Sequence, residues 1–215
     1  MSFINNRFIT FLTKLADMSI LSLLWLVACI PIITIVPASI ALYYAAVKVI
    51  RRGAGYPVRD FITGFVKNIK QGIVVNLFYL FVAFLLYLAY SYSQAAGLTT
   101  LIGKFYYLFF MVSVFLLACI TAYLFPVLSR FEVSLISAFR LAVSFAFGNL
   151  LTLVPLLFTF TGAVAIIYIF APSILVLPAA YCFLLSYSVE KVLGNYLRQS
   201  MANTSLYENM WYMDT

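Results

Sequence analysis

The side chains that most often perform chemistry inside a membrane are missing from the apolar parts of this chain. Ion-coupled pumps and proton relays place a carboxylate, a lysine or a histidine within a membrane span. The chain contains no histidine, and no Asp, Glu, Lys or Arg occurs in residues 18–47, 71–103, 105–129 and 141–189. It also has no Gly-rich phosphate-binding loop, no serine-nucleophile motif and no aspartate-rich metal cluster. We therefore expect no enzymatic activity, no cofactor and no metal site.

A few polar side chains lie at the ends of the apolar stretches. Asn76 and Asn149 are near the starts of two of them, where amides commonly make structural hydrogen bonds. The charged pairs Arg130-Glu132 and Glu190-Lys191 also occur at such ends. We interpret these charges as markers of the membrane–water interface.

The three cysteines are Cys29, Cys119 and Cys182, and each lies in an apolar run without CxxC spacing. This pattern indicates small buried hydrophobic residues and favours neither a disulfide nor a metal site.

The composition explains why chemistry-bearing residues are so rare. Of 215 residues, 66% are hydrophobic and only 9% are charged, and the mean hydropathy is +1.09. A soluble domain usually has about 45–50% apolar and about 25% charged residues. We predict a single all-α integral membrane domain over residues 1–215, built as a polytopic helical bundle. In a membrane protein, the net charge of +7 indicates first how the chain is oriented across the membrane. We therefore expect no nucleic-acid partner.

The lengths of three charge-free stretches set most of the span count. One crossing takes about 20 residues. Residues 105–129 fit one span, and residues 71–103 fit one span with a polar tail that forms a loop. Residues 141–189 are too long for one span, and Pro172 divides them into two.

Residues 18–47 allow two interpretations. They contain Pro31 and Pro37, separated by β-branched residues. Either one kinked helix crosses once, which gives five spans in total, or the chain turns here and a second helix over residues 38–51 returns, which gives six.

The positions of the basic residues favour six spans. Cytoplasmic loops collect Lys and Arg. Six spans starting inside put twelve of the thirteen basic residues on the cytoplasmic side and leave Lys104 outside, whereas five spans put ten inside. We expect six spans with both termini cytoplasmic.

Two segments resemble amphipathic helices on the cytoplasmic surface. Residues 57–72 place Phe61, Phe65 and Ile69 at four-residue spacing, and residues 134–149 form the second helix. The second helix also carries a stripe of small side chains, Ser134, Ala138, Ala142 and Ala146. Small residues at this spacing allow close helix approach, either to a partner subunit or to the protein's own bundle. The candidate partner-interface residues are thus this stripe together with Phe61 and Phe65.

The last candidate for a partner contact lies in the predicted cytoplasmic tail, residues 199–215. This tail contains Trp211 beside two tyrosines and two acidic residues. The alternatives are docking on a partner, contact with the membrane surface, or a free chain end.

Two segments of the chain carry a family resemblance. CIPIITIVPASIALYYAAVKVIR (residues 29–51) and YLFPVLSRFEVSLISAFRLAV (residues 123–143) resemble the YesL-like family of bacterial integral membrane proteins. The length and span layout extend this resemblance over most of the chain. Pro37 departs from the family pattern, which places a small residue nearby. The matched positions are Pro31, Thr34, Ala41, Tyr43 and Tyr44 in the first segment, and Phe125, Pro126, Arg130 and Phe131 in the second.

The resemblance implies a function only in outline. The family is of unknown function, and its members tend to accompany carbohydrate ABC importers and glycan-degrading enzymes. It implies a non-enzymatic accessory subunit of a bacterial oligosaccharide ABC importer, located in the cytoplasmic membrane, with permease subunits and membrane lipid as partners. Such a subunit would support permease assembly, stability or gating.

The sequence is also compatible with two other functions. One is a stand-alone passive carrier or channel for a small neutral solute, which the proline-containing bend and a short internal similarity between residues 61–65 and 135–139 favour. The other is retention of anionic lipid by the basic segment over residues 48–70.

Overall fold

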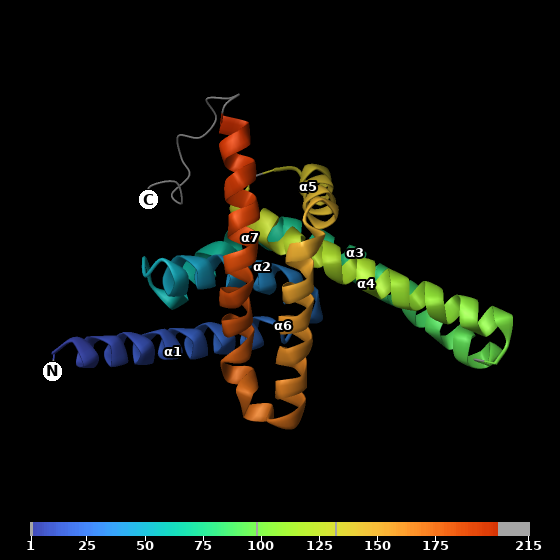
Figure 1. Cartoon of the computed structure of the whole chain (residues 1–215), viewed down its shortest axis with the longest axis horizontal. Helices are drawn as coiled ribbons and strands as arrows, with labels where there is room; N and C mark the ends of the chain where they lie inside the picture. Colours follow the sequence, from blue (N-terminus) through green and yellow to red (C-terminus); the bar gives the residue numbers. More distant parts are fainter. Residues whose placement is uncertain (1, 98, 132, 202–215) are drawn as a thin grey trace.

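The protein is all-helical in the part of the chain that the structure describes. This structure is a computed structural model that describes residues 2–97, 99–131 and 133–201. Seven α-helices and three short 3-10 or π segments occur there, and no strand (Figure 1). The all-α fold class is therefore confirmed. The elements are α1 (Ser2–Ala28), η1 (Ile32–Thr34), α2 (Ile35–Ala45), η2 (Ala46–Arg51), α3 (Pro57–Ala96), α4 (Leu101–Arg130), α5 (Leu135–Gly148), α6 (Leu150–Ile169), η3 (Ala171–Leu175) and α7 (Leu177–Met201).

Five helical stretches among the described residues are long and apolar enough to cross a membrane. They are Ile9–Ala28, Ile32–Arg51, Pro57–Ala96, Leu101–Arg130 and Thr152–Ile169. By helix length and hydropathy the chain is thus a multi-pass membrane protein. The chain does turn between α1 and α2, as the six-span interpretation requires. The count is five because α7, which carries Glu190 and Lys191, is not among these stretches.

The bend between α1 and α2 is held by hydrogen bonds. The Thr34 hydroxyl donates to the carbonyl oxygens of Ala28 at 2.6 Å and Pro31 at 2.7 Å. The Asn76 side chain on α3 accepts a hydrogen bond from the Val36 amide at 3.3 Å and donates to the Ile32 carbonyl at 3.1 Å. The prediction of a structural role for this asparagine is therefore confirmed, since its amide hydrogen-bonds to two backbone groups of the bend.

Helix α3 is one continuous helix of 40 residues. The predicted separate surface helix over residues 57–72 is therefore wrong, and those residues form the first turns of α3. The face of α3 that packs on α2 carries small and polar side chains at four-residue spacing. They are Asp60, Gly64, Asn68, Gly72 and Asn76, and all are buried.

The glycines on this face allow helices α2 and α3 to approach each other closely. A Cβ atom on Gly72 would lie only 2.8–2.9 Å from atoms of Pro37, and one on Gly64 would lie 3.4 Å from the Cα of Ala41. Lipid tails are as apolar as the side chains of a helix, so no hydrophobic force drives helices together in a membrane. Helices there associate through close van der Waals contact of this kind.

Helix α5 packs into the molecule by its small side chains. Ala138, Ala142 and Ala146 are at most 2% exposed and belong to the same core cluster as the second half of α4. Ser134 is the N-cap residue, whose hydroxyl accepts a hydrogen bond from the Ser137 amide. The three alanines of the stripe therefore pack against the protein's own bundle, as one of the two interpretations predicts, and do not form an exposed docking face, whereas Ser134 is exposed.

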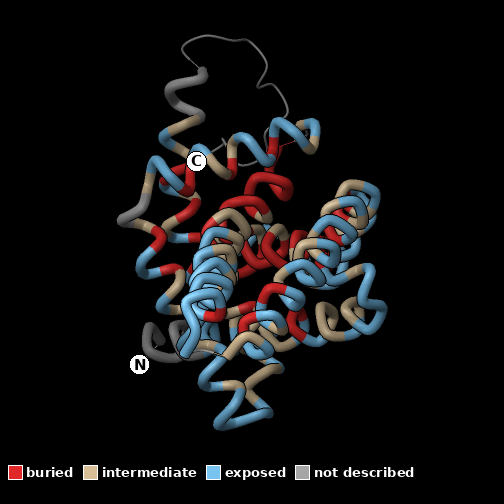
Figure 2. Tube along the Cα trace, turned by 90° about the vertical axis from the view of Figure 1, so that its right-hand side faces the viewer, coloured by how far each residue is buried: buried red, intermediate tan, exposed pale blue. Residues whose placement is uncertain are grey.

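The buried core forms a base from which helical hairpins project. The core is built from α2, the second half of α4, α5, the start of α6 and the second half of α7. Burial concentrates there, whereas the projecting helices are largely exposed (Figure 2). The distal parts of α3 and α4 form a long two-helix arm, and α6 and α7 form a second hairpin that runs in another direction (Figure 1).

Candidate functional site

A buried ion pair joins three helices in the base. The Arg130 guanidinium, at the end of α4, lies 2.6 Å from the Glu190 carboxylate of α7, and their side chains are 2% and 13% exposed. The Tyr43 hydroxyl of α2 donates a hydrogen bond to the same Glu190 oxygen at 3.2 Å. Charges in so dry an environment are stable only when paired and hydrogen-bonded. This cluster, the Arg130–Glu190–Tyr43 junction, therefore depends on all three helices being in place.

A second contact fixes α7 against the end of the α2–η2 segment. The Arg51 guanidinium donates a hydrogen bond to the Ser186 carbonyl and lies 5.0 Å from the centre of the Tyr187 ring. Arg51 ends the π-helical segment η2. Because a π turn contains more residues than an α turn, it rotates the residues that follow it relative to a regular helix. Ser186 lies one helical turn before Glu190, so both contacts use one region of α7.

The turn between η2 and α3 is held by a further ion pair. Lys48 lies 2.6 Å from the Asp60 carboxylate, whose other oxygen accepts a hydrogen bond from the Tyr56 amide at 2.9 Å. Gly55 has a φ of +123° and lies so close to Asp60 that a Cβ atom there would overlap the carboxylate. The position therefore requires glycine, and Asp60 caps the start of α3 as well as holding η2.

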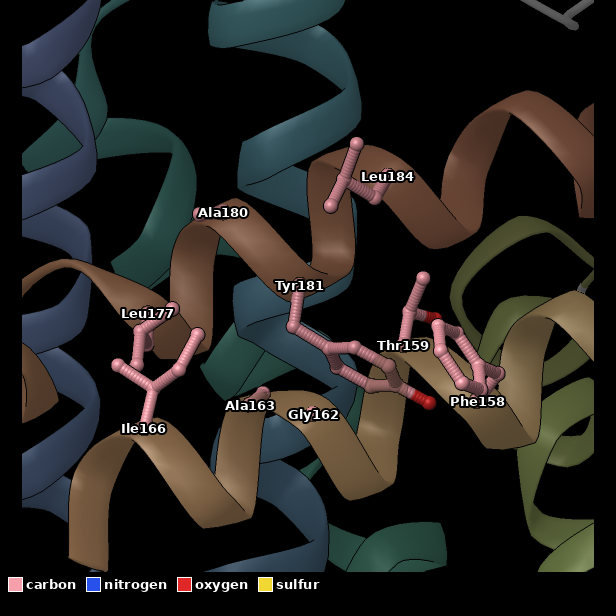
Figure 3. A pocket seen from close by; sticks show the side chains of 9 residues that line it. All are labelled: Phe158, Thr159, Gly162, Ala163, Ile166, Leu177, Ala180, Tyr181 and Leu184. Carbon is pink, nitrogen blue, oxygen red and sulfur yellow. The ribbon is translucent and has the colours of Figure 1, made fainter. Parts of the chain in front are cut away.

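A shallow hollow lies on the hairpin of α6 and α7 (Figure 3). It is an open groove of about 220 Å³, and its lining is almost entirely apolar. The ring of Tyr181 extends from α7 toward α6 beside Gly162. A groove of this composition suits a hydrocarbon chain and lacks the convergent polar groups that a polar ligand requires. Its lining residues are Phe158, Thr159, Gly162, Ala163, Ile166, Leu177, Ala180, Tyr181 and Leu184.

The polar side chains at these sites form ion pairs and hydrogen bonds between helices. Among the described residues, no group of three His, Cys, Asp or Glu side chains is placed to hold a metal ion. The described ion pairs and the Asn76 amide connect helices to one another. The arrangement ties the helices of the base together and leaves the apolar faces of the hairpins exposed.

The structure brings together residues from the two segments that carry the family resemblance. Tyr43 from the first and Arg130 from the second meet at Glu190. Pro31 and Thr34 form the bend. Tyr44 packs near Gly64.

The other candidate residues occupy varied positions. Phe125 packs beside Tyr79, with ring centres 6.3 Å apart, and Pro126 is buried inside α4. Phe61 is buried and Phe65 is half-buried, so neither forms an exposed stripe. Trp211 lies outside the described residues.

The comparisons with known proteins identify a family domain in one part of the chain. Residues 18–90 match the model of a family described as "Protein of unknown function, DUF624". The match includes the first resembling segment and ends within α3, before the second. No curated protein and no solved structure matches the chain significantly. The family description assigns no function.

Proposed function

We propose that this chain, whose residues 18–90 match the DUF624 family model, is a non-enzymatic accessory subunit of a bacterial carbohydrate ABC importer. In this proposal it binds the membrane-spanning permease subunits for oligosaccharides and supports their assembly, stability or gating. The exposed arm formed by the distal parts of α3 and α4 carries the proposal.

The arm offers long apolar faces to other membrane helices. Phe84 on α3 and Phe115 on α4 are 57% and 55% exposed, and both lie among many other exposed aliphatic and aromatic side chains. Near the tip, α3 and α4 are tied to each other, since the Ser93 hydroxyl donates to the Gly103 carbonyl at 3.0 Å. In lipid, further helices pack on such faces through van der Waals contact.

The base supports the same proposal because its buried polar groups bind one another and join the chain's own helices. The Arg130–Glu190–Tyr43 junction and the Lys48–Asp60 pair stabilise the chain's own helices. A base whose helices are tied together and carry exposed apolar hairpins is suited to assembly, because partners then bind a preformed surface.

In this proposal both termini are cytoplasmic, which requires α7 to return across the membrane beside α6 as a sixth span; the charge distribution supports this orientation. Lys104 lies near the tip of the arm, and the basic turn with Arg52 and Arg59 lies at the opposite end of α3. The positive-inside rule then places the tip of the arm outside and the base toward the cytoplasm of a bacterial cell.

Copurification tests the proposed function. The tagged full-length chain is extracted from its bacterial host in mild detergent, and the proteins that accompany it are identified by mass spectrometry. We expect permease subunits of a sugar importer. A double variant, Phe84→Ala with Phe115→Ala, is expected to lose them, whereas Phe158→Ala retains them because that residue, 80% exposed, lies on α6. Recovery of the chain alone, from membranes in which the importer stays assembled, contradicts the proposal.

A second experiment distinguishes the accessory role from a carrier or channel for a small neutral solute. Proteoliposomes that contain only this chain are loaded with a labelled neutral sugar, and its release is measured. The proposed accessory role predicts release no faster than from protein-free vesicles. Specific, saturable flux favours the carrier instead.

A further inference from the structure

The first half of α3 exposes an unusual face. Along residues 58–74, the exposed side chains are aliphatic or basic, with one threonine, and they recur at three- and four-residue spacing. The acidic residue of this segment, Asp60, is buried on the opposite side against Lys48. The aliphatic members are Val58, Ile62, Val66 and Val74, which are 47%, 52%, 64% and 53% exposed, and the basic members are Arg59, Lys67 and Lys70.

This face inverts the usual pattern of a water-exposed helix. An exposed helix face in a soluble protein is polar, and its buried face is apolar. Here the buried face carries Asp60, Asn68 and Asn76 with two glycines, and the aliphatic residues point outward. Such a face suits the boundary between lipid headgroups and acyl chains, where aliphatic side chains enter the acyl region and cations stay at the phosphates.

The length of α3 places this face at that boundary. Forty residues span about 60 Å at 1.5 Å per residue, whereas the hydrocarbon core is about 30 Å thick and the whole bilayer about 40–45 Å. The charge-free part of α3 begins at Gln71, so the basic residues lie in the part that leaves the core. The helix continues without a break, and the exposed valines and isoleucine therefore stay next to the membrane.

We propose that this face of α3 binds anionic phospholipid. The phosphate groups contact Arg59, Lys67 and Lys70, and the upper parts of the acyl chains contact Ile62 and Val66. Two features favour a lipid over a protein partner: all charges on the face are positive, and the face continues into the membrane-spanning half of the same helix. Each basic side chain near an anionic surface contributes roughly 1 kcal/mol, or about a fivefold change in affinity.

Lipid selection from a mixed bilayer tests the proposal. The full-length protein is reconstituted in nanodiscs with equal phosphatidylglycerol and phosphatidylcholine, extracted in mild detergent, and the lipids retained per protein are quantified by mass spectrometry. We expect enrichment of phosphatidylglycerol. The variant R59Q/K67Q/K70Q should lose that enrichment, with an affinity lowered about fivefold per charge, and R59K/K67R/K70R should retain it.

A matched control uses Lys104, at the far end of α3 and α4 from this face. K104Q should keep the wild-type enrichment. Unchanged enrichment in the triple Gln variant, or equal loss in K104Q, overturns the proposal. If the triple variant does not fold, the single variant K70Q should show a smaller loss in the same assay.

The depth of the face gives an independent readout. Tryptophan placed at Val66 should be quenched by phosphatidylglycerol brominated on its acyl chains, and less by equally brominated phosphatidylcholine. Quenching by aqueous iodide but by neither lipid contradicts the proposal and indicates a face that is open to water or to a soluble protein. Free glycerol phosphate should not displace the lipid, because it lacks the acyl contacts.

Discussion

Replacement of Glu190 by glutamine tests whether the Arg130–Glu190–Tyr43 junction holds the base together. The Arg130 side chain is only 2% exposed and lies 2.6 Å from the carboxylate. Glu190→Gln removes the negative charge that this buried guanidinium contacts. Removal of one partner from a buried ion pair typically costs about 3–5 kcal/mol. For a chain of this size, each kcal/mol corresponds to about 2–4 °C in Tm, so the Tm is expected to fall by about 6–20 °C.

Thermal unfolding in detergent can be followed with a thiol-reactive dye. Cys119 is 5% exposed in the folded chain, so its reaction with the dye reports unfolding. Arg130→Met should lower the Tm about as much as Glu190→Gln. The double variant Arg130→Met with Glu190→Leu should be more stable than either single variant, because neither charge is then left without its partner. Tyr43→Phe removes one hydrogen bond to a charged group and should cost less, about 1.5–3 kcal/mol.

Two results would refute this reasoning. One is a Tm within about 2 °C of wild type for both single variants, which would mean that this ion pair stabilises the fold no more than an exposed surface ion pair does. The other is a double variant whose destabilisation equals the sum for the single variants, because additive effects indicate that the two side chains do not interact.

Three further predictions address packing and orientation. Gly72→Ala should destabilise the chain by about 1–3 kcal/mol, because the added Cβ clashes with Pro37 of α2. Gly162→Ala is the control and should leave the Tm equal or higher, since a Cβ there meets no atom within 4 Å. Equal effects of the two substitutions would contradict the α2–α3 contact. Asn76→Leu should lower stability by about 1–3 kcal/mol in the same dye assay, because backbone groups of the bend lose their partner; an unchanged Tm would argue against that role. A cysteine at Thr99 should react with a membrane-impermeant maleimide in intact cells, and one at Ala54 should react only after permeabilisation. Both signals are measured above that of the wild-type chain. The reverse pattern would contradict the proposed orientation.

The membrane fold was predictable because the lipid imposes it on local sequence. Spans must be long, apolar and helical, and the bend follows from Pro31 and Pro37, whose effects are local. The buried position of Ala138 and Ala142 followed one of the two interpretations of their spacing.

The candidate site was less predictable because it depends on contacts between distant parts of the chain. Arg130 and Glu190 are sixty positions apart, and their sequence context indicates only interface markers, because the contact between the end of α4 and α7 exists only in the folded chain. The continuity of α3 was missed because Lys67 and Lys70 suggested a helix outside the membrane. The spacing of Gly64, Asn68 and Gly72 was a usable signal, since small and polar residues every four positions indicate close helix packing in a membrane.

Site-specific photo-crosslinking in living cells tests the accessory role most directly. A photoreactive phenylalanine analogue replaces Phe109, which is 56% exposed on the α3/α4 arm, or Phe158, which is 80% exposed on α6. The account predicts an adduct between position 109 and a permease subunit of a carbohydrate importer, with little or none from position 158. Adducts with lipid alone at position 109, in cells where the importer is expressed and assembled, would contradict it.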